Sequence, residues 1–273
     1  MKVLRWITSI VFVAVLGLYV AFSWTERKNR DDTFPVIDLP GQELQLSIHA
    51  PREQLLDGVT AYDEKDGDLT DRLRIESVSK FVEPGLCKVT YAVVDGDNHV
   101  AKATRTMRYT DYVPPRFFLK IPMFFYEDDD VNIREQIGAM DCIDGDISDR
   151  VTVLSTQKVS PSSDSFIMSV QVTNSHGDKA YLDIPVYMAK STERGAEITL
   201  TQPMIYAEQG STPDFAAYIG QVTVDGVPVE AYTTRITSNF KSDQPGVYAV
   251  QIMVTDAAGN EGRTVLTVVV EEN

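Results

Sequence analysis

The pattern of apolar and polar residues divides the chain into one long apolar segment and a body of alternating runs. Residues 6–24, WITSIVFVAVLGLYVAFSW, contain no charged side chain. A helix of this length spans about 28 Å, close to the thickness of the hydrocarbon core of a bilayer. Tryptophan stands at both ends of the segment, where amphipathic rings prefer the membrane interface. The pattern therefore predicts a transmembrane helix near the N-terminus.

A cleaved signal peptide is the alternative, because Ala21-Phe22-Ser23 has the small-x-small spacing of a cleavage site. The apolar run is longer than the roughly 7–15 residues usual in signal peptides, which favours an uncleaved signal anchor. Basic residues flank both ends of the segment, so the positive-inside rule does not decide the orientation. A short N-terminal tail before a large body favours a cytoplasmic N-terminus and an extracellular body.

Beyond residue 35 apolar and polar residues alternate with a period of two, which is typical of half-buried strands. The run 88–94 is expected to be the best-buried strand of its module, and Cys87 at its start is expected to tolerate serine. Pro114-Pro115 and the polar linker 190–195 mark boundaries. We expect four parts: residues 1–30 (short cytoplasmic tail, signal anchor and basic flank), and β modules at 35–112, 113–190 and 195–273.

Two phrases recur along the body. AYDEKDGDLTDRL at 61–73 returns 78 residues later as AMDCIDGDISDRV at 139–151. PGLCKVTYAVVD at 84–95 matches PGVYAVQIMVTD at 245–256, and each is followed by a short turn rich in Gly, Asp and Asn. Gly and Asn supply the positive φ that tight hairpins need. Self-similarity of this kind indicates an array of like modules.

These phrases resemble the bacterial Ig-like domain found in tandem on surface proteins and in some pesticidal crystal proteins. The resemblance rests on A-x-D-x-x-D-G-D-[LI]-[TS] and P-G-x-Y-x-V-x-[YI]-x-V-x-D-x-x-G-N, and it covers residues 35–273. The first module has both phrases, with Cys87 in place of the tyrosine; the second mainly has the first, and the third mainly the second. The resemblance implies an all-β chain of tandem immunoglobulin-like β-sandwiches behind one N-terminal transmembrane helix. It implies a cell-surface spacer or binding module and no chemistry.

Charge and cysteine content narrow the function classes. The chain has a net charge of −15, and the residues after position 30 hold 20 basic and 39 acidic side chains. A body this acidic repels nucleic-acid phosphates, so nucleic acid is excluded as a partner. The two cysteines, Cys87 and Cys142, fall in different modules, so neither module can close an internal disulfide. A bridge between them stays open, since connectivity cannot be read from sequence.

The acidic turns are the repeated polar feature and the candidate metal site. Calcium takes six to eight oxygen ligands, often from clustered carboxylates. The candidate ligands are Asp63, Asp66, Asp68, Asp141, Asp144 and Asp146. The spacing of an EF-hand does not fit, because with Gly67 at its sixth position Tyr62 and Leu73 would be the end ligands. The favoured alternative is that Asp-Gly makes a turn whose aspartates cap backbone amides, with no cofactor.

No motif with supporting partners indicates catalysis. Ser77-Val-Ser-Lys80 fits S-x-x-K, but the companion motifs S-D-N and K-T-G are missing. Two further features have two readings each. The acidic run 127–130 is a solvated loop or a cation or partner patch. The aromatic stretch is either part of the core or a ligand-binding patch, and it comprises Phe117, Phe118, Phe124, Phe125 and Tyr126.

The leading hypothesis is a single-pass membrane protein whose Ig-like domains are extracellular and present a binding surface. Its partners would be the membrane, through the N-terminal helix, and an unidentified protein or glycan, for adhesion or contact with wall polymer. One alternative is a structural spacer or accessory subunit of a membrane complex. An enzyme is the least favoured class, because no nucleophile, base or metal site has supporting spacing.

We predict that residues 1–24 remain on the mature protein as its anchor. The reason is the uncharged span of 19 residues with tryptophan at both ends. Mass spectrometry of the mature N-terminus measures this directly, and a chain that starts at or near Trp24 would show that the segment is a cleaved signal peptide.

Overall fold

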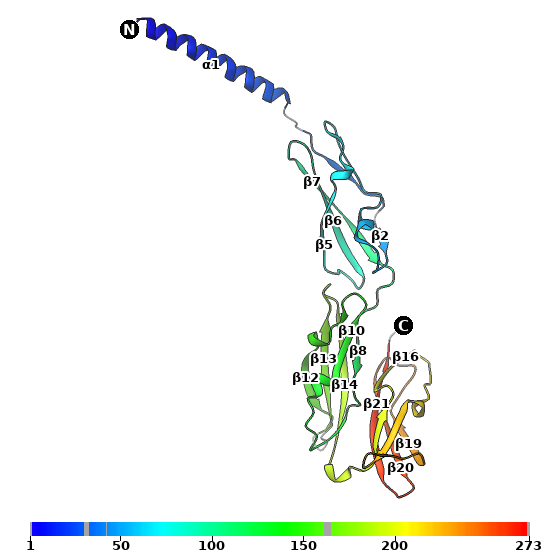
Figure 1. Cartoon of the computed structure of the whole chain (residues 1–273). Helices are drawn as coiled ribbons and strands as arrows, with labels where there is room; N and C mark the ends of the chain where they lie inside the picture. The colour runs from blue at the N-terminus through cyan, green and yellow to red at the C-terminus, as the bar shows by residue number, and fades with distance from the viewer. Residues whose placement is uncertain (1, 30–32, 42, 161–164, 272–273) are drawn as a thin grey trace. The chain divides into compact units, whose positions relative to one another are not determined.

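The computed structural model describes residues 2–29, 33–41, 43–160 and 165–271. Helix α1 covers Lys2–Asn29, and every following regular element is a strand or a short 3-10 helix (Figure 1). Residues 6–24 within α1 have a mean hydropathy of 2.1 and are not buried against the rest of the protein. The expected helix is therefore present and is long and apolar enough to cross a membrane. That it does so stays a prediction.

The described strands form three sandwiches of seven strands, each with one sheet of three and one of four. The first sandwich comprises β1 (Val36–Asp38), β2 (Glu43–Leu46), β3 (Thr60–Asp63), β4 (Gly67–Asp68), β5 (Arg74–Val78), β6 (Leu86–Val94) and β7 (Val100–Tyr109). The second comprises β8 (Arg116–Leu119), β9 (Phe124–Tyr126), β10 (Ile137–Asp141), β11 (Gly145–Asp146), β12 (Thr152–Lys158), β13 (Phe166–Thr173) and β14 (Lys179–Ala189). The third comprises β15 (Glu197–Leu200), β16 (Met204–Ala207), β17 (Ile219–Val224), β18 (Val227–Pro228), β19 (Tyr232–Ser238), β20 (Gly246–Asp256) and β21 (Glu261–Val270).

The same topology recurs in all three sandwiches. The four-stranded sheets run β2-β7-β6-β5, β9-β14-β13-β12 and β16-β21-β20-β19. In each, a short early strand pairs parallel with the last strand, while the two long hairpin strands pair antiparallel. Seven strands in packed layers of three and four form an immunoglobulin-like β-sandwich, although the last two strands lie here in the larger sheet and not in the smaller one as in the constant type. The expected all-β, Ig-like fold is confirmed at this level.

The described residues divide into two compact units. One contains residues up to Val82 together with Leu86–Thr110, and the other contains residues 83–85 and 111–271. The second unit therefore holds both the second and the third sandwich. The expected bounds of three separate domains, 35–112, 113–190 and 195–273, stay a prediction.

Strand β6 shows how the period-two pattern builds the first core. Val89, Tyr91 and Val93 are at most 1% exposed, as the alternation predicts. Cys87 is also fully buried and packs in the same core, and burial raises the pKa of its thiol to about 11. The expectation that Cys87 tolerates serine is therefore corrected, because a hydroxyl there would be removed from water. Both cysteines are free thiols.

A buried arginine distinguishes the first sandwich from the other two. Arg105 lies on the inward face of β7 and is 4% exposed. Its Nε donates to the hydroxyl of Tyr91 at 2.8 Å, and its guanidinium also donates to the carbonyl of Leu55 at 2.9 Å. The tyrosine hydroxyl donates to the same carbonyl at 2.6 Å. This network ties the short helix η1 (Arg52–Leu56) to the sheet.

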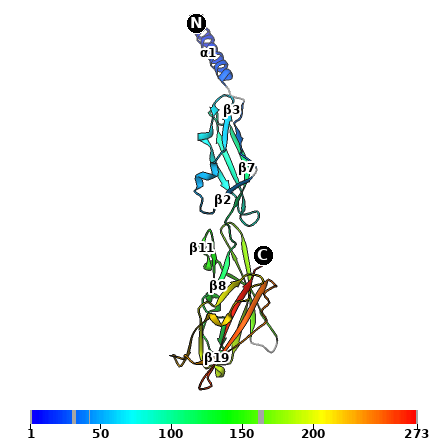
Figure 2. The same cartoon turned by 90° about the vertical axis from the view of Figure 1, so that its right-hand side faces the viewer.

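Strand β21 is buried on both faces. Leu266, Val268 and Val270 belong to the core of the third sandwich. Val265, Thr267 and Val269 point the other way and are at most 7% exposed. Val269 belongs to the hydrophobic cluster of the second sandwich, as does Met204 of β16. The third sandwich thus lies alongside the second, with the outer face of its four-stranded sheet as the contact (Figure 1; Figure 2 gives the view turned by 90°).

Two arginines clamp this joint. Arg116 of β8 makes a two-pronged ion pair with Glu271 and lies 5.0 Å from the centroid of the Tyr206 ring. Tyr206 in turn donates to the carbonyl of Phe117 at 3.0 Å, and burial raises its pKa to about 12. Arg194, in the linker between the two sandwiches, lies 4.3 Å from the centroid of the Tyr126 ring.

We predict that a charge at Val93 and a hydroxyl at Cys87 destabilise the first sandwich to different degrees. Val93→Asp should unfold it, because an isolated buried carboxylate costs several kcal/mol against a typical stability of about 5–15 kcal/mol. Cys87→Ser should lower the unfolding free energy by about 1–3 kcal/mol, the penalty of a buried polar group without a compensating bond. Thermal melts of the full-length chain measure both, and a Cys87→Ser melt identical to wild type would contradict the burial of this residue.

Candidate functional site

The repeated acidic turns have the same local structure in the first two sandwiches. Asp63 and Asp141 end β3 and β10 and are at most 3% exposed. Asp63 Oδ1 accepts from the backbone N–H groups of residues 65 and 66 at 2.9 and 3.0 Å. Asp141 Oδ1 accepts from residues 143 and 144 at 2.9 and 2.8 Å. Gly67 and Gly145 then take φ of +76° and +73°, a conformation that residues with a Cβ rarely adopt. These carboxylates therefore shape the turn.

The third aspartate of each phrase caps the next short helix. Asp68 Oδ1 accepts from the N–H of Thr70 at 2.9 Å, and Asp146 Oδ1 accepts from the N–H of Ser148 at the same distance. Hydrogen bonds from Thr70 and from Ser148 lower the pKa of these two carboxyl groups. Both carboxylates thus accept hydrogen bonds from within their own turn.

The middle aspartate joins the acidic turn to the neighbouring hairpin turn. Asp144 accepts from the N–H and the hydroxyl of Ser175, both at 2.7 Å, and from Arg150 at 2.6 Å. Burial acts to raise its pKa, but these hydrogen bonds outweigh it and lower the pKa. In the first sandwich Asp66 accepts from the N–H of Gly96. A Cβ on Gly96 would lie 2.8 Å from the Asp66 carboxylate, so a larger residue there would force this side chain to shift.

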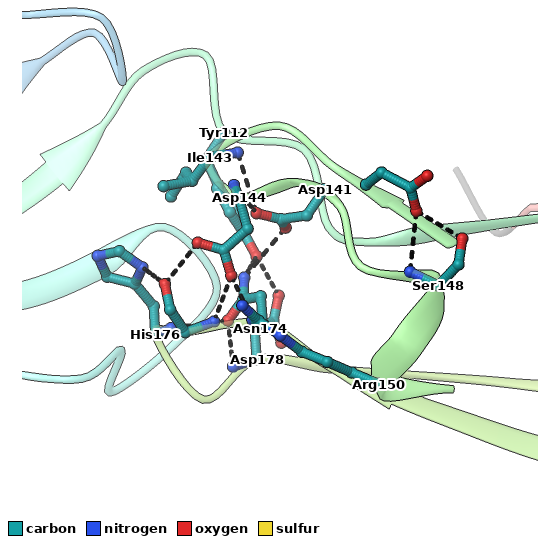
Figure 3. Close-up of polar contacts among 11 residues, drawn as sticks. Tyr112, Asp141, Ile143, Asp144, Ser148, Arg150, Asn174, His176 and Asp178 are labelled. Carbon is teal, nitrogen blue, oxygen red and sulfur yellow. Dashed lines mark hydrogen bonds and ion pairs between the residues drawn. The ribbon is translucent and has the colours of Figure 1, made fainter. Parts of the chain in front are cut away.

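The hairpin turn of the second sandwich is held by the buried side chain of Asn174 (Figure 3). Its Nδ2 donates to Asp141 at 3.1 Å and to the hydroxyl of Tyr112 at 2.9 Å. Its Oδ1 accepts from the N–H groups of His176 and Asp178 at 3.0 and 2.9 Å. The Tyr112 hydroxyl donates to the Asp178 carboxylate at 2.6 Å. Burial, followed by this carboxylate, raises the pKa of Tyr112 strongly.

Asp95 and Asp256 take the position of Asn174 in the other two sandwiches. Asp95 Oδ1 accepts from the N–H groups of Asp97 and His99 at 2.9 and 2.8 Å, and its Oδ2 lies 2.8 Å from His99 Nδ1. Asp256 accepts from the N–H and the side-chain amide of Asn260, both at 2.8 Å. The same turn therefore occurs in every sandwich, led by aspartate in the first and third and by asparagine in the second.

The six candidate calcium ligands use their carboxylates in hydrogen bonds of these kinds. Among the residues that the structure describes, no group of three or more His, Cys, Asp or Glu side chains is placed to hold a metal ion. The hydrogen bonds agree with the capping interpretation that the sequence favoured. Calcium binding at these turns stays an untested hypothesis.

The acidic run has a partner within the chain. Asp128 and Asp129 accept from the Arg194 guanidinium at 2.9 and 2.7 Å. The pKa of Asp128 is lowered, most by a hydrogen bond with the Ser191 side chain and next by the one with Arg194. The loop 127–130 therefore contributes to the clamp between the second and third sandwiches.

The residues of the aromatic stretch divide between the core and the surface of the second sandwich. Phe117 and Phe125 are at most 4% exposed and lie in the core of the second sandwich. Phe118, Phe124 and Tyr126 are half-buried on the other face. The Phe118 ring covers Gly138 so closely that a Cβ there would lie 2.2 Å from it. Of the stretch, Phe124 lines a cleft in the second unit.

This cleft has a volume of about 530 Å³ and lies between the second and third sandwiches. Phe124 of β9 and Tyr187 of β14 stand directly opposite each other in the parallel register and line one side. The other lining elements are β19, β20, β21 and the linker after β14. Its charged lining residues are Lys190, Glu193, Arg235 and Arg263.

Apart from Phe124, these residues cannot be recognised from the sequence, because no motif connects them. Tyr187, Arg235 and Arg263 lie on three separate strands and meet only because the sandwiches pack side by side. One signal was present: the run TVLTVVV at 264–270 is nearly continuous in apolar or β-branched residues. Such a run is typical of a strand that is buried on both faces. It indicates that a second layer covers β21.

Comparisons with known proteins give structural likenesses only. No family model matches the chain, and no curated protein does. Among solved structures, the M60 catalytic domain with CBM51 domains of Clostridium perfringens ZmpB is 12% identical over 89% of this chain and 31% of its own, with a TM-score of 0.24. A protocadherin gamma B4 extracellular domain is 12% identical over 89% of this chain and 50% of its own, with a TM-score of 0.21. The human desmocollin-1 ectodomain is 12% identical over 89% of this chain and 62% of its own, with a TM-score of 0.21.

The chain thus spans between about a third and three fifths of the length of these structures. At TM-scores of this size the likenesses carry no argument. The Ig-like sandwich fold rests on the strand order and pairing described above.

We predict that calcium does not change the stability of the sandwiches. The turn aspartates already accept hydrogen bonds from backbone, serine and arginine donors, and calcium would have to displace them. Thermal melts of the full-length chain with calcium and with a chelator should coincide. A rise of several degrees with calcium would overturn this prediction, because a ligand that binds only the native state must stabilise it.

Proposed function

We propose that this protein is a single-pass membrane protein whose extracellular Ig-like domains bind a ligand without catalysis. In this proposal residues 1–30 hold the cytoplasmic tail, the signal anchor and its basic flank. The domains are 35–112, 113–190 and 195–273, and they are of the bacterial Ig-like type. The binding surface is the cleft between the second and third domains.

The observation that carries the proposal is the cleft itself. It is preformed by a joint that buries both faces of β21, so no rearrangement is needed to open it. Its volume of about 530 Å³ lies within the usual range of ligand sites, roughly 300–1,000 Å³. Its half-buried aromatic wall and its charged groups offer a ligand both apolar contact and polar anchoring points. The acidic turns, by contrast, already use their carboxylates within the fold.

The membrane attachment is supported by the 19-residue apolar span Trp6–Trp24. Its side chains are exposed in the described structure, which in water would leave a large apolar surface uncovered. A lipid bilayer is the environment that accepts such a helix. The acidic body that follows suits an aqueous compartment.

The lack of catalysis is proposed because the serine of the one nucleophile motif has no base beside it. Ser77, the first residue of S-x-x-K, is an exposed residue of strand β5 that pairs with Thr90 of β6. Within the described ranges of the chain, its hydroxyl makes no hydrogen bond to a histidine, lysine or carboxylate side chain. This is not the geometry of a serine activated by a base.

We predict that filling the cleft abolishes ligand capture. Thr237 lines the cleft on the edge strand β19 and is exposed, so Thr237→Trp should occupy the space without disturbing a core. Thr233→Trp is the matched control, since residue 233 is exposed on the same face of the same strand but does not line the cleft. The full-length wild type and both variants serve as bait in pull-downs from the native membrane and cell surface.

Capture by wild type and Thr233→Trp, with loss in Thr237→Trp, is the expected outcome. A spacer that uses its length alone would capture the same partners in all three forms. That outcome would remove the cleft from the proposed function and leave the structural role.

A further inference from the structure

We propose that the cleft binds a short oligosaccharide that carries a carboxylate group. This inference rests on the proposed binding role of the cleft and names the chemical class of its ligand. Three features of the lining residues support it: their charge, their aromatic wall and the size of the space.

The charge in the cleft is opposite to the charge of the chain. Lys190, Arg235 and Arg263 line it together with a single acidic residue, Glu193, in a chain of net charge −15. Arg263 pairs with Glu193 at 3.0 Å. Arg235 and Lys190 make no ion pair within the described ranges of the chain. A concave site with low-dielectric walls focuses such a positive potential and favours an anionic ligand.

Arg235 is the residue best suited to receive the anion. It stands on β19 opposite Met253 of β20, in a regular antiparallel ladder that fixes its backbone. A guanidinium presents a planar fork of donors that matches a carboxylate bidentately. Gln251 and Thr237, which also line the cleft, add neutral donors and acceptors of the kind that sugar hydroxyls need.

The aromatic wall supplies the flat apolar surface that a sugar ring can cover. Phe124 and Tyr187 are half-buried and stand side by side on β9 and β14. The Phe124 ring is held edge-on by Tyr126, at a centroid distance of 5.5 Å, and Tyr126 lies beneath Arg194. The wall is therefore fixed by the same clamp that holds the two sandwiches together, so little side-chain entropy is lost on binding.

The size of the cleft and the charge of the body limit the ligand to a few sugar rings. A cleft of about 530 Å³ has the size of a small-ligand site, whereas a stable protein interface buries roughly 800 Å² on each partner. A long polyanion would meet the 39 acidic side chains that follow residue 30. A short chain with one carboxylate avoids this repulsion and still pairs with Arg235.

The test is calorimetry on the full-length chain in phosphatidylcholine nanodiscs with two trisaccharides. One ends in glucuronic acid and the other ends in glucose, so they differ by a single carboxylate. Wild type should bind the acid at least about tenfold more tightly, the effect of one charge-assisted hydrogen bond. Arg235→Glu should lose about that factor for the acid and leave the weaker binding of the neutral sugar unchanged.

Two further variants make the result specific. Arg72→Glu makes the same change of charge at an exposed residue in the first sandwich and should bind both sugars as wild type does. Tyr187→Ala should weaken the binding of both sugars to the same degree, because it removes the surface on which a sugar ring stacks. The retained binding of the neutral sugar by Arg235→Glu shows that this variant is folded, and a circular dichroism melt checks it independently.

Equal affinity of wild type for the two sugars would overturn the inference that the ligand carries a carboxylate. The cleft would then be a site for a neutral saccharide. An equal loss in Arg72→Glu and Arg235→Glu would show a general effect of net charge and would also overturn the inference. If neither sugar binds, the ligand class is wrong. The proposed function then stands or falls by the Thr237→Trp pull-down, which does not depend on the identity of the ligand.

Discussion

The burial of the outer face of β21 is the contact on which the second compact unit depends. A fully buried valine contributes about 1.5–3 kcal/mol relative to an exposed one, while an exposed ion pair contributes about 0–1 kcal/mol. Val269 and Met204, which pack in the hydrophobic cluster of the second sandwich, therefore supply more of the free energy that joins the two sandwiches than the half-exposed clamp arginines do. The ion pairs of Arg116 and Arg194 act mainly on geometry, since each fixes the position of one element against another. The cleft lies beside this joint and is lined by residues of both sandwiches.

The acidic character of the chain and the basic character of the cleft have separate physical origins. In the first two sandwiches, turn carboxylates accept backbone N–H groups that no strand can satisfy, and buried donors need such partners. Asp144 and Asp66 extend this function by joining two turns that lie about thirty residues apart in the chain. The basic residues of the cleft are few, and of these Arg263 is neutralised by Glu193. The positive charges of Lys190 and Arg235 remain in the lining of the cleft, where a ligand can reach them.

The sequence predicts local structure well and the joint poorly, for physical reasons. The period of two identifies the inward face of β6, and Asp-Gly identifies the turns, because both depend on neighbouring residues. Arg105 is the opposite case: a charged residue at an inward position is recognisable only when the carbonyl of Leu55 and the hydroxyl of Tyr91 are seen beside it. The acidic run 127–130 looked like a solvated loop because its partner Arg194 lies more than sixty residues away. The cleft combines strands from two sandwiches, so no local pattern contains it.

The last strand of each sandwich shows how one fold produces different neighbours. On β7 the outward residues include Lys102, Thr104 and Arg108, which suit water. On β14 they include Lys179, Tyr181 and Asp183 before the strand reaches Tyr187 at the cleft. On β21 the corresponding positions are Val265, Thr267 and Val269, and all three are buried. The inward faces are mostly apolar in all three strands, with Arg105 of β7 as the exception, so they specify the sandwich. The outward faces differ, and the apolar outward face of β21 therefore specifies that the third sandwich packs laterally against the second.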